Sequence, residues 1–403
     1  ASNNTAVGYL ALTANTTGTQ SVAVGANALD AQTTGGYNTA VGYNTLSAMT
    51  TGNNCVAVGS TAGAANTTGA NLTAVGANCL DANTTGSENT GIGSHALSVN
   101  TTGGSLTALG YGTLIANTTA NHNVAIGRDA MAANTTGSEN TAVGTYSLDA
   151  NTTASNNTAV GYQALTANTT AANNTAVGYQ ALDATTTGDR NTAVGSNALT
   201  ACISNAHTAV GYDAGSAITT GYQNTCVGIA AGASITTGTN NLALGLGAGQ
   251  ASNPGGAVTT GSNQVCIGDG TITNAHIQVD WTIASDKRDK TDVSPLDLGL
   301  DFINKLEPVT YRWDKRGKYN KDQSVTPDGT HKEEQLEGGF LAQDVEVIEN
   351  QYGYKTDDKT NLITNLSEDG KMYGIKYSKL VPMLTKAIQE LSTKVEELED
   401  KLK

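Results

Sequence analysis

A short alternation of side-chain types recurs along most of the chain. In residues 5–8, Thr and Val fall on one side of an extended segment while Ala and Gly fall on the other, which is the period of a β-strand. An apolar patch follows at residues 11–14, and residues 15–18 (NTTG) supply turn chemistry. This pattern predicts a strand, a corner, a second strand and a second corner in each unit.

The unit repeats with a constant length. The motif N-T-A-V-G-Y-x-A-L-x-A-N-T-T-G places its first glycine at twelve positions 17 residues apart: Gly8, Gly25, Gly42, Gly59, Gly76, Gly93, Gly110, Gly127, Gly144, Gly161, Gly178 and Gly195. Four more copies follow: Gly211, Gly228, Gly245 and Gly268. Such a short unit cannot bury its own apolar face, so successive units must stack as coils. Sixteen coils at roughly 4.8 Å make a rod of about 75 Å, with Asn and Thr side chains hydrogen-bonded in ladders along it.

Composition makes the rod thin and weakly charged. Aromatic residues are 5% of the 403 residues, too few to fill a thick enzyme core. The net charge is −14, and residues 1–284 hold two basic residues, Arg128 and Arg190, so the clustered cations that bind nucleic acid are missing. Neither an apolar run long enough to span a membrane nor a signal peptide is found, so no membrane insertion is expected.

Composition also places a domain boundary. The first lysine of the chain is Lys287, and charged residues become frequent from there on. An abrupt change of charge pattern of this kind separates domains. We therefore predict a β-solenoid rod at 1–270, a junction at 271–284 and an α+β domain at 285–403.

The repeat resembles a known family. Segments 21–25 (SVAVG), 123–127 (NVAIG) and 241–245 (NLALG) look like the repeat of trimeric autotransporter adhesin heads. The resemblance extends from residue 4 to about residue 270. It implies an all-β, left-handed parallel β-roll in which three chains surround one axis.

Two rows of rod side chains are candidates for chemistry. Four acids lie five residues after the unit glycine: Asp30, Asp81, Asp149 and Asp183. None occupies neighbouring coils, whereas a polysaccharide depolymerase needs two carboxylates within several ångströms, so we favour solvated surface acids. Tyr162 and Tyr179 follow the glycines of adjacent coils, where stacked rings serve either as a sugar platform or, as we favour, as cross-coil packing.

Cysteines and histidines lack metal-ligand spacing. Cys226 and Cys266 replace the same alanine two coils apart, beyond disulfide reach, so buried hydrophobic roles are expected for the cysteines. The histidines show no zinc pattern, and the glycine-rich segment 245–249 lacks the helix that phosphate binding requires. No cofactor or metal is expected.

Serine, acids and bases gather in residues 285–293. A serine becomes a nucleophile when a base takes its proton, and a neutral lysine amine can do so, although a solvated linker is the alternative. After this segment, 296–306 predicts a short amphipathic stretch, 308–313 a strand, and 338–345 a strand running into a turn or helix.

These motifs resemble another family. The order S-D-x-R-x-K, L-D-F-I-N-K-L-x-P-V-T-Y-R-W, G-F-L-A-Q-D-V and Y-S-K-L-V-P-M-L-x-K-A-I-Q-E-L, from about Ser285 to Leu391, is similar to the C-terminal intramolecular chaperone and auto-processing domain of phage tail spikes, tail fibres and endosialidases. The resemblance implies a domain that trimerises a β-rich stalk, sets its register and then cuts itself off.

The resemblance also implies residue roles. Ser285 is the nucleophile and Lys290 the general base, and the cut falls between Ser285 and Asp286 or one bond earlier, after Ala284. Two further residues match the motifs and are assigned supporting roles: Arg288 and Gln343.

An apolar heptad ends the chain. Its members recur at steps of four and three residues: Leu384, Ile388, Leu391, Val395, Leu398 and Leu402. This seam predicts a coiled-coil helix over 382–403 that starts at Pro382. Ile and Val at a with Leu at d favour two strands, so a trimer rests on the resemblance. An amphipathic helix packed on its own domain is the alternative.

The two halves predict one function. A uniform repeat offers many slipped registers, and a removable trimerising domain fixes the register and makes unfolding hard to retrace. We expect the distal part of a homotrimeric viral tail fibre or spike on the virion, whose partner is a glycan or protein receptor on the host surface. The last domain would be a single-turnover, self-cleaving serine peptidase. A bacterial surface fibre or adhesin with the same chaperone is the alternative, and a depolymerase ranks last.

Overall fold

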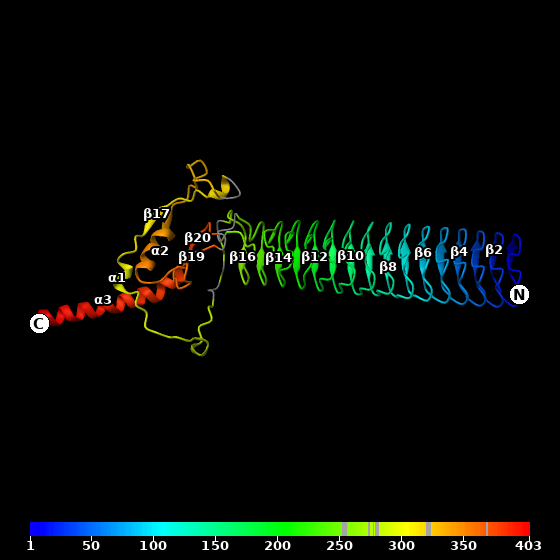
Figure 1. Ribbon diagram of the computed structural model, residues 1–403, viewed down its shortest axis with the longest axis horizontal. Helices are drawn as coiled ribbons and strands as arrows, with labels where there is room; N and C mark the ends of the chain where they lie inside the picture. The colour runs from blue at the N-terminus through cyan, green and yellow to red at the C-terminus, as the bar shows by residue number, and fades with distance from the viewer. Residues whose placement is uncertain (252–255, 273–274, 277, 279–281, 320–323, 368–369) are drawn as a thin grey trace. The chain divides into compact units, whose positions relative to one another are not determined.

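The computed structural model describes residues 1–403 except 252–255, 273–274, 277, 279–281, 320–323 and 368–369. The chain divides into two compact units, one of residues 1–248 and 259–267, the other of residues 249–258 and 268–403 (Figure 1). Part of the junction predicted at 271–284 falls outside the described residues.

The first unit is a parallel β-solenoid with one short strand in each coil. Sixteen strands form a single parallel sheet in sequence order, and each strand pairs in register with the strand of the next coil. The strands are β1 (Thr5–Val7), β2 (Val22–Val24), β3 (Thr39–Val41), β4 (Val56–Val58), β5 (Thr73–Val75), β6 (Thr90–Ile92), β7 (Thr107–Leu109), β8 (Val124–Ile126), β9 (Thr141–Val143), β10 (Thr158–Val160), β11 (Thr175–Val177), β12 (Thr192–Val194), β13 (Thr208–Val210), β14 (Thr225–Val227), β15 (Leu242–Leu244) and β16 (Val265–Ile267). The predicted solenoid of 17-residue coils is therefore confirmed.

The second apolar patch of each coil does not form the strand predicted for it. In the second coil, Asn27 and Leu29 have φ of 57° and 51°, and the segment is a run of turns. Positive φ at Leu29 breaks the alternation of an extended chain. As a result, Ala28 and Leu29 are both fully buried although they are adjacent in sequence. Burial of a leucine side chain offsets the backbone strain, which is about 1–2 kcal/mol for an L residue.

The predicted ladders are present inside the solenoid. From Asn66 to Asn151, each buried Asn of the N-T-T-G segment accepts a hydrogen bond at Oδ1 from the side-chain amide of the next coil, at 2.8–3.1 Å, and Asn168 is the last donor of this ladder. Thr side chains beside them donate to the main-chain carbonyl one coil further on, as Thr67 does to Thr84 at 3.0 Å. These bonds satisfy polar groups that a thin solenoid cannot expose to water.

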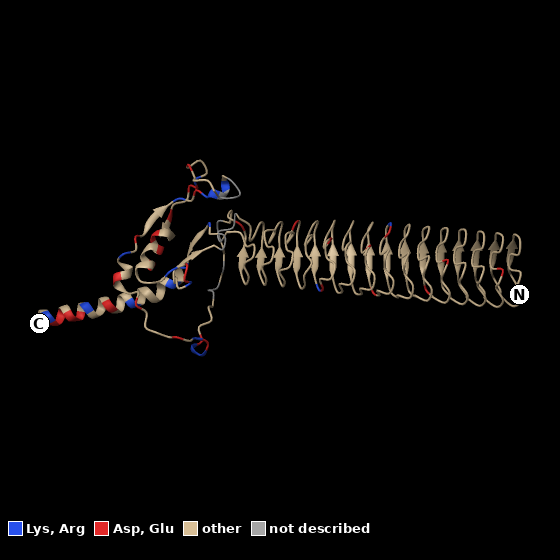
Figure 2. Ribbon diagram, viewed as in Figure 1, with Lys and Arg blue, Asp and Glu red and all other residues tan. Residues whose placement is uncertain are grey.

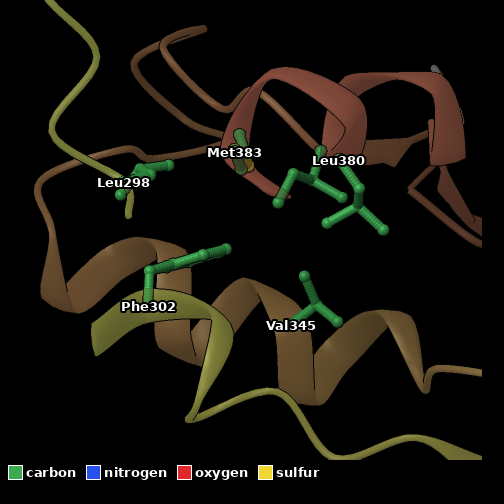
Figure 3. Packing of buried hydrophobic residues seen from close by; sticks show 6 residues of the cluster. Leu298, Phe302, Val345, Leu380 and Met383 are labelled. Carbon is green, nitrogen blue, oxygen red and sulfur yellow. The ribbon is translucent and has the colours of Figure 1, made fainter. Parts of the chain in front are cut away.

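The second unit contains a small α/β domain. Its elements are η1 (Lys287–Asp289), α1 (Leu300–Ile303), β17 (Val309–Tyr311), η2 (Arg316–Lys318), β18 (Glu337–Gly339), α2 (Ala342–Gln351), β19 (Thr364–Leu366), β20 (Tyr373–Ile375), η3 (Tyr377–Lys379) and α3 (Leu380–Leu402). The strand pairs β17–β18 and β19–β20 are antiparallel. The hydrophobic core gathers side chains from α1, α2, α3 and the intervening loops (Figure 3): Leu298, Phe302, Val345, Ile363, Leu380 and Met383.

The C-terminal helix begins earlier than predicted. α3 starts at Leu380, so Pro382 lies within its first turn and not at its first residue. The difference is small because the main-chain N–H groups of a first turn have no partner within the helix, and proline lacks only that group. Leu380, Met383 and Ala387 are buried, which anchors the first turns of α3 in the domain core.

Candidate functional site

A single helical turn brings the predicted serine and lysine together. Ser285 precedes η1 (Lys287–Asp289) and Lys290 is its C-cap, whose main-chain N–H bonds back to the carbonyl of Lys287. This reversal lets side chains five residues apart meet, and Lys290 Nζ donates to Ser285 Oγ at 2.6 Å. A neutral lysine amine at that distance would be placed to accept the hydroxyl proton.

Asp286 and Arg288 form an ion pair beside the serine. Asp286 is the N-cap of η1, where its carboxylate accepts the main-chain N–H of Arg288 at 2.9 Å. The guanidinium of Arg288 also donates to this carboxylate, through Nη2 at 2.6 Å and Nε at 3.1 Å. These bonds lower the pKa of Asp286. Arg288 therefore pairs with this carboxylate, while Lys290 contacts Ser285.

The predicted supporting residue Gln343 is not bonded to the group around Ser285 in the described part of the chain. It is the second residue of α2 (Ala342–Gln351), and its side chain is exposed. Within the described part of the chain, its side chain makes no hydrogen bond to residues 285–290. The structure therefore brings Ser285, Asp286, Arg288 and Lys290 together, and Gln343 is not among them.

Comparison with known families places this group at the start of a recognised domain. Residues 285–355 match the family described as the chaperone of endosialidase. The chain thus carries a chaperone-of-endosialidase domain that follows the β-solenoid in the sequence, and the match begins at Ser285. No curated protein sequence matches this chain.

The predicted heptad seam is exposed along α3. Its six members have exposed fractions from 45% to 87%: Leu384, Ile388, Leu391, Val395, Leu398 and Leu402. The helix contacts its own domain through a different face, where Met383 is buried and Glu390 accepts the main-chain N–H of Leu300 at 2.8 Å. One face of α3 is therefore packed on its own domain, as the alternative interpretation predicted, while the seam is exposed and the coiled coil stays a prediction.

A buried glutamate was missed by the sequence analysis. Glu349 of α2 is fully buried, and its carboxylate accepts the main-chain N–H groups of Leu362, Ile363 and Thr364 at 2.8–3.0 Å together with the Thr364 hydroxyl at 2.5 Å. One signal was available, because Glu349 follows Val345 by one helical turn on the apolar face. The hydrogen bonds of Glu349 connect β19 to α2. Among the described residues, Glu349 has no contact with Ser285.

The two candidate rows of the rod differ in their surroundings. The rings of Tyr162 and Tyr179 stack with centroids 5.6 Å apart and planes at 11°, so the cross-coil packing that we favoured is present between these two coils. Asp81, Asp149 and Asp183 are partly buried, so the favoured interpretation of solvated surface acids is wrong for these three. Burial raises the pKa of each, and the negative charge of Asp129 adds to the effect at Asp149.

The cysteines lie in the coil interior, apart from the half-buried Cys266. Cys226 and Cys266 share one column of the sheet with Ala243 between them, and all five cysteines are free. Burial raises the pKa of Cys79 and of Cys226 to about 12, which makes both thiols unreactive at neutral pH. Among the described residues, no three His, Cys, Asp or Glu side chains gather as a metal site. Where helices are described, none is long and apolar enough to cross a membrane.

Charge separates the two parts of the chain. Figure 2 shows few acidic or basic residues along the solenoid ribbon, while both kinds occur along α3 and through the chaperone domain. Charges beside an apolar heptad seam are typical of coiled coils, where they set partner choice. The solenoid surface offers little for a charged ligand to bind.

Proposed function

We propose that this chain is the distal part of a homotrimeric viral tail fibre or spike that attaches to the host surface through a glycan or protein receptor. Its last domain assembles three chains, sets the register of the solenoid and releases itself by one self-cleavage. The contact between Lys290 Nζ and Ser285 Oγ at 2.6 Å, inside the segment that matches the chaperone family, carries this proposal.

The chemistry proceeds through the serine oxygen. The Lys290 amine takes the hydroxyl proton of Ser285 as Oγ attacks a carbonyl carbon, the proton passes to the departing amine, and water then hydrolyses the ester. Attack on the carbonyl of Ala284 closes a five-membered ring and cuts before Ser285. We favour cleavage of the bond between Ser285 and Asp286. Cleavage there requires the Ser285 hydroxyl of a second copy, because attack of Ser285 Oγ on the carbonyl of the same residue would close a strained four-membered ring.

Two exposed apolar features support assembly of several copies. One is the seam of α3. The other is the last residue of each solenoid strand, which is Val, Ile or Leu in all sixteen coils and is exposed by 36–58% at the positions Val7, Val24, Val41, Val58, Ile92, Leu109, Val194, Val210, Leu244 and Ile267. Long apolar rows on a monomer surface mark protein interfaces. A second and third copy of this chain are the partners that share the same repeat length.

Self-cleavage is tested by intact mass under denaturing conditions. Wild type is expected to yield residues 1–285 and 286–403, or 1–284 and 285–403, and Ser285→Ala and Lys290→Ala are expected to remain whole because each removes one partner of the dyad. Ser294→Ala and Lys287→Ala, which alter an exposed serine and lysine nearby, are expected to cleave like wild type. A wild-type chain that stays whole after folding would overturn the proposal.

Assembly through the seam is tested by replacing Ile388 with Glu. Ile388→Glu would bury one carboxylate per chain in the seam, and an unpaired buried charge is strongly unfavourable, so the native mass is expected to fall from trimer to monomer. Gln389→Glu adds the same charge at an exposed position beside the seam and is expected to leave the native mass unchanged. Equal native masses for the two variants would contradict a role of the seam in assembly.

A further inference from the structure

One buried position of the solenoid holds a titratable side chain, unlike the equivalent positions of the neighbouring coils. Four residues before the unit glycine, the row holds Asn in most coils of the rod's second half, and His207 takes this place in the thirteenth coil. His207 is 1% exposed. Its coil is also shortened, since the preceding step between unit glycines is 16 residues long.

His207 makes the hydrogen bonds of the Asn that it replaces. In the neighbouring coils, Asn191 Oδ1 accepts the next main-chain N–H at 2.9 Å, and Asn191 Nδ2 donates to a carbonyl at 2.8 Å. In the same way, His207 Nδ1 accepts the N–H of Asn224 at 3.2 Å, and His207 Nε2 lies 2.8 Å from the carbonyl of Gly221. The imidazole therefore substitutes for an amide in both roles.

These partners assign one tautomer. Nδ1 faces a donor and must be unprotonated, while Nε2 faces a carbonyl and must carry the proton. Ser204 Oγ lies 2.9 Å from Nε2, which is the distance of a nucleophile from its base. The nitrogen that faces Ser204 already holds a proton, however, and Ser204 itself donates to the carbonyl of Gly221. The pair is therefore structural and not a catalytic dyad.

The surroundings oppose a charged imidazole. Burial lowers the pKa of His207, and the carbonyl of Gly221 offsets this only in part. The ionisable group nearest in the network is the Cys202 thiol, whose Sγ is 3.7 Å from Ser204 Oγ and whose own pKa is raised by burial, so it stays neutral. Among the described residues, no carboxylate contacts the ring to stabilise its cation.

We propose that His207 is an acid-sensitive joint in the solenoid. A proton added at Nδ1 would point at the N–H of Asn224, so two donors would face each other and the bond between the thirteenth and fourteenth coils would be lost. The stack would then open at β13 and β14, while coils with Asn at this position would stay closed. This property is independent of the cleavage and assembly proposed above.

The sign of the pH dependence follows from linkage. Because the folded chain binds the proton at a lower pH than the unfolded chain, no stability is lost above the ordinary histidine pKa of 6.5. Below that pH the opened state binds the proton first. The opening constant of these coils is then expected to rise up to tenfold for each pH unit, until the pKa of the folded chain is reached.

Hydrogen exchange of the full chain between pH 8 and pH 5 tests the joint. We compare protection of residues 205–227 in wild type, His207→Asn and His122→Asn. His207→Asn restores the residue of the neighbouring coils and is expected to match wild type at pH 8 and to exceed its protection below pH 6.5. His122→Asn changes an exposed histidine, at a position where other coils have Asn54 and Asn71, and is expected to follow wild type. Parallel pH curves for wild type and His207→Asn would overturn the proposal.

Discussion

Replacing one glycine of the unit row with alanine is expected to split the solenoid into two separately unfolding parts. Gly161 follows β10 with φ of 140°, a conformation that L side chains rarely adopt. A Cβ at this position would lie 2.3 Å from the carbonyl oxygen of Gly178, one coil further on, and 2.7 Å from its carbonyl carbon. Both obstacles are main-chain atoms, so no side chain can move aside.

The expected cost exceeds that of an ordinary surface change. A strained main-chain conformation alone costs about 1–3 kcal/mol, and relieving the clash requires β10 and β11 to separate. In a stack where each coil contacts only its neighbours, stability is approximately a sum of neighbour terms, so the loss at one interface uncouples the coils on either side.

Limited proteolysis followed by mass measurement detects this uncoupling. Gly161→Ala is expected to be cut between residues 150 and 185 under conditions in which wild type survives. Gly112→Asn is the matched control, because equivalent positions hold Asn27 and Asn44 at φ of 57° and 50°, and the only close atoms belong to the movable Asp129 side chain. Protease resistance of Gly161→Ala equal to that of wild type would refute the clash.

The sequence was sufficient to predict the features that follow from the repeat length. It did not predict the features that depend on the sign of the backbone angle φ. Spacing of 17 residues, small inward residues and N-T-T-G turns were enough to predict coils, parallel pairing and polar ladders. The segment of Ala28 and Leu29 was mistaken for a strand because two apolar neighbours fit either conformation by composition. Only the left-handed φ at Leu29 lets both side chains point inward, and leucine gives no sign of that preference in a sequence.

The candidate site was predictable where its parts are close in sequence. Ser285 and Lys290 are five residues apart, and one turn of η1 suffices to bring them together. Gln343 depends on the tertiary placement of α2, which no local pattern determines, and its side chain does not join the group. Glu349 was missed for the same reason, since its partners at 362–364 come from a loop and strand that composition does not link to α2.

Removing the buried carboxylate of Glu349 is expected to unfold the chaperone domain. Glu349→Ala leaves three main-chain N–H groups and the Thr364 hydroxyl without their acceptor in the interior. A buried donor without a partner costs about 1–3 kcal/mol, so the sum is on the order of 5 kcal/mol, comparable with the whole stability of a small domain. Glu349→Gln keeps the shape and one acceptor oxygen, and a smaller loss is expected.

Tryptophan fluorescence isolates this effect from the rod. Both tryptophans, at positions 281 and 313, follow the solenoid repeats, so urea unfolding monitored by their emission reports on the C-terminal part of the full chain when every protein compared also carries Ser285→Ala and stays uncleaved. The urea midpoint is expected to fall in the order wild type, Glu349→Gln, Glu349→Ala, with Glu397→Ala, an exposed glutamate of α3, close to wild type. In chains that keep Ser285, cleavage is expected to fail in Glu349→Ala, because the domain that assembles the chains is then unfolded. An unchanged midpoint for Glu349→Ala would show that the loop at 362–364 finds other acceptors.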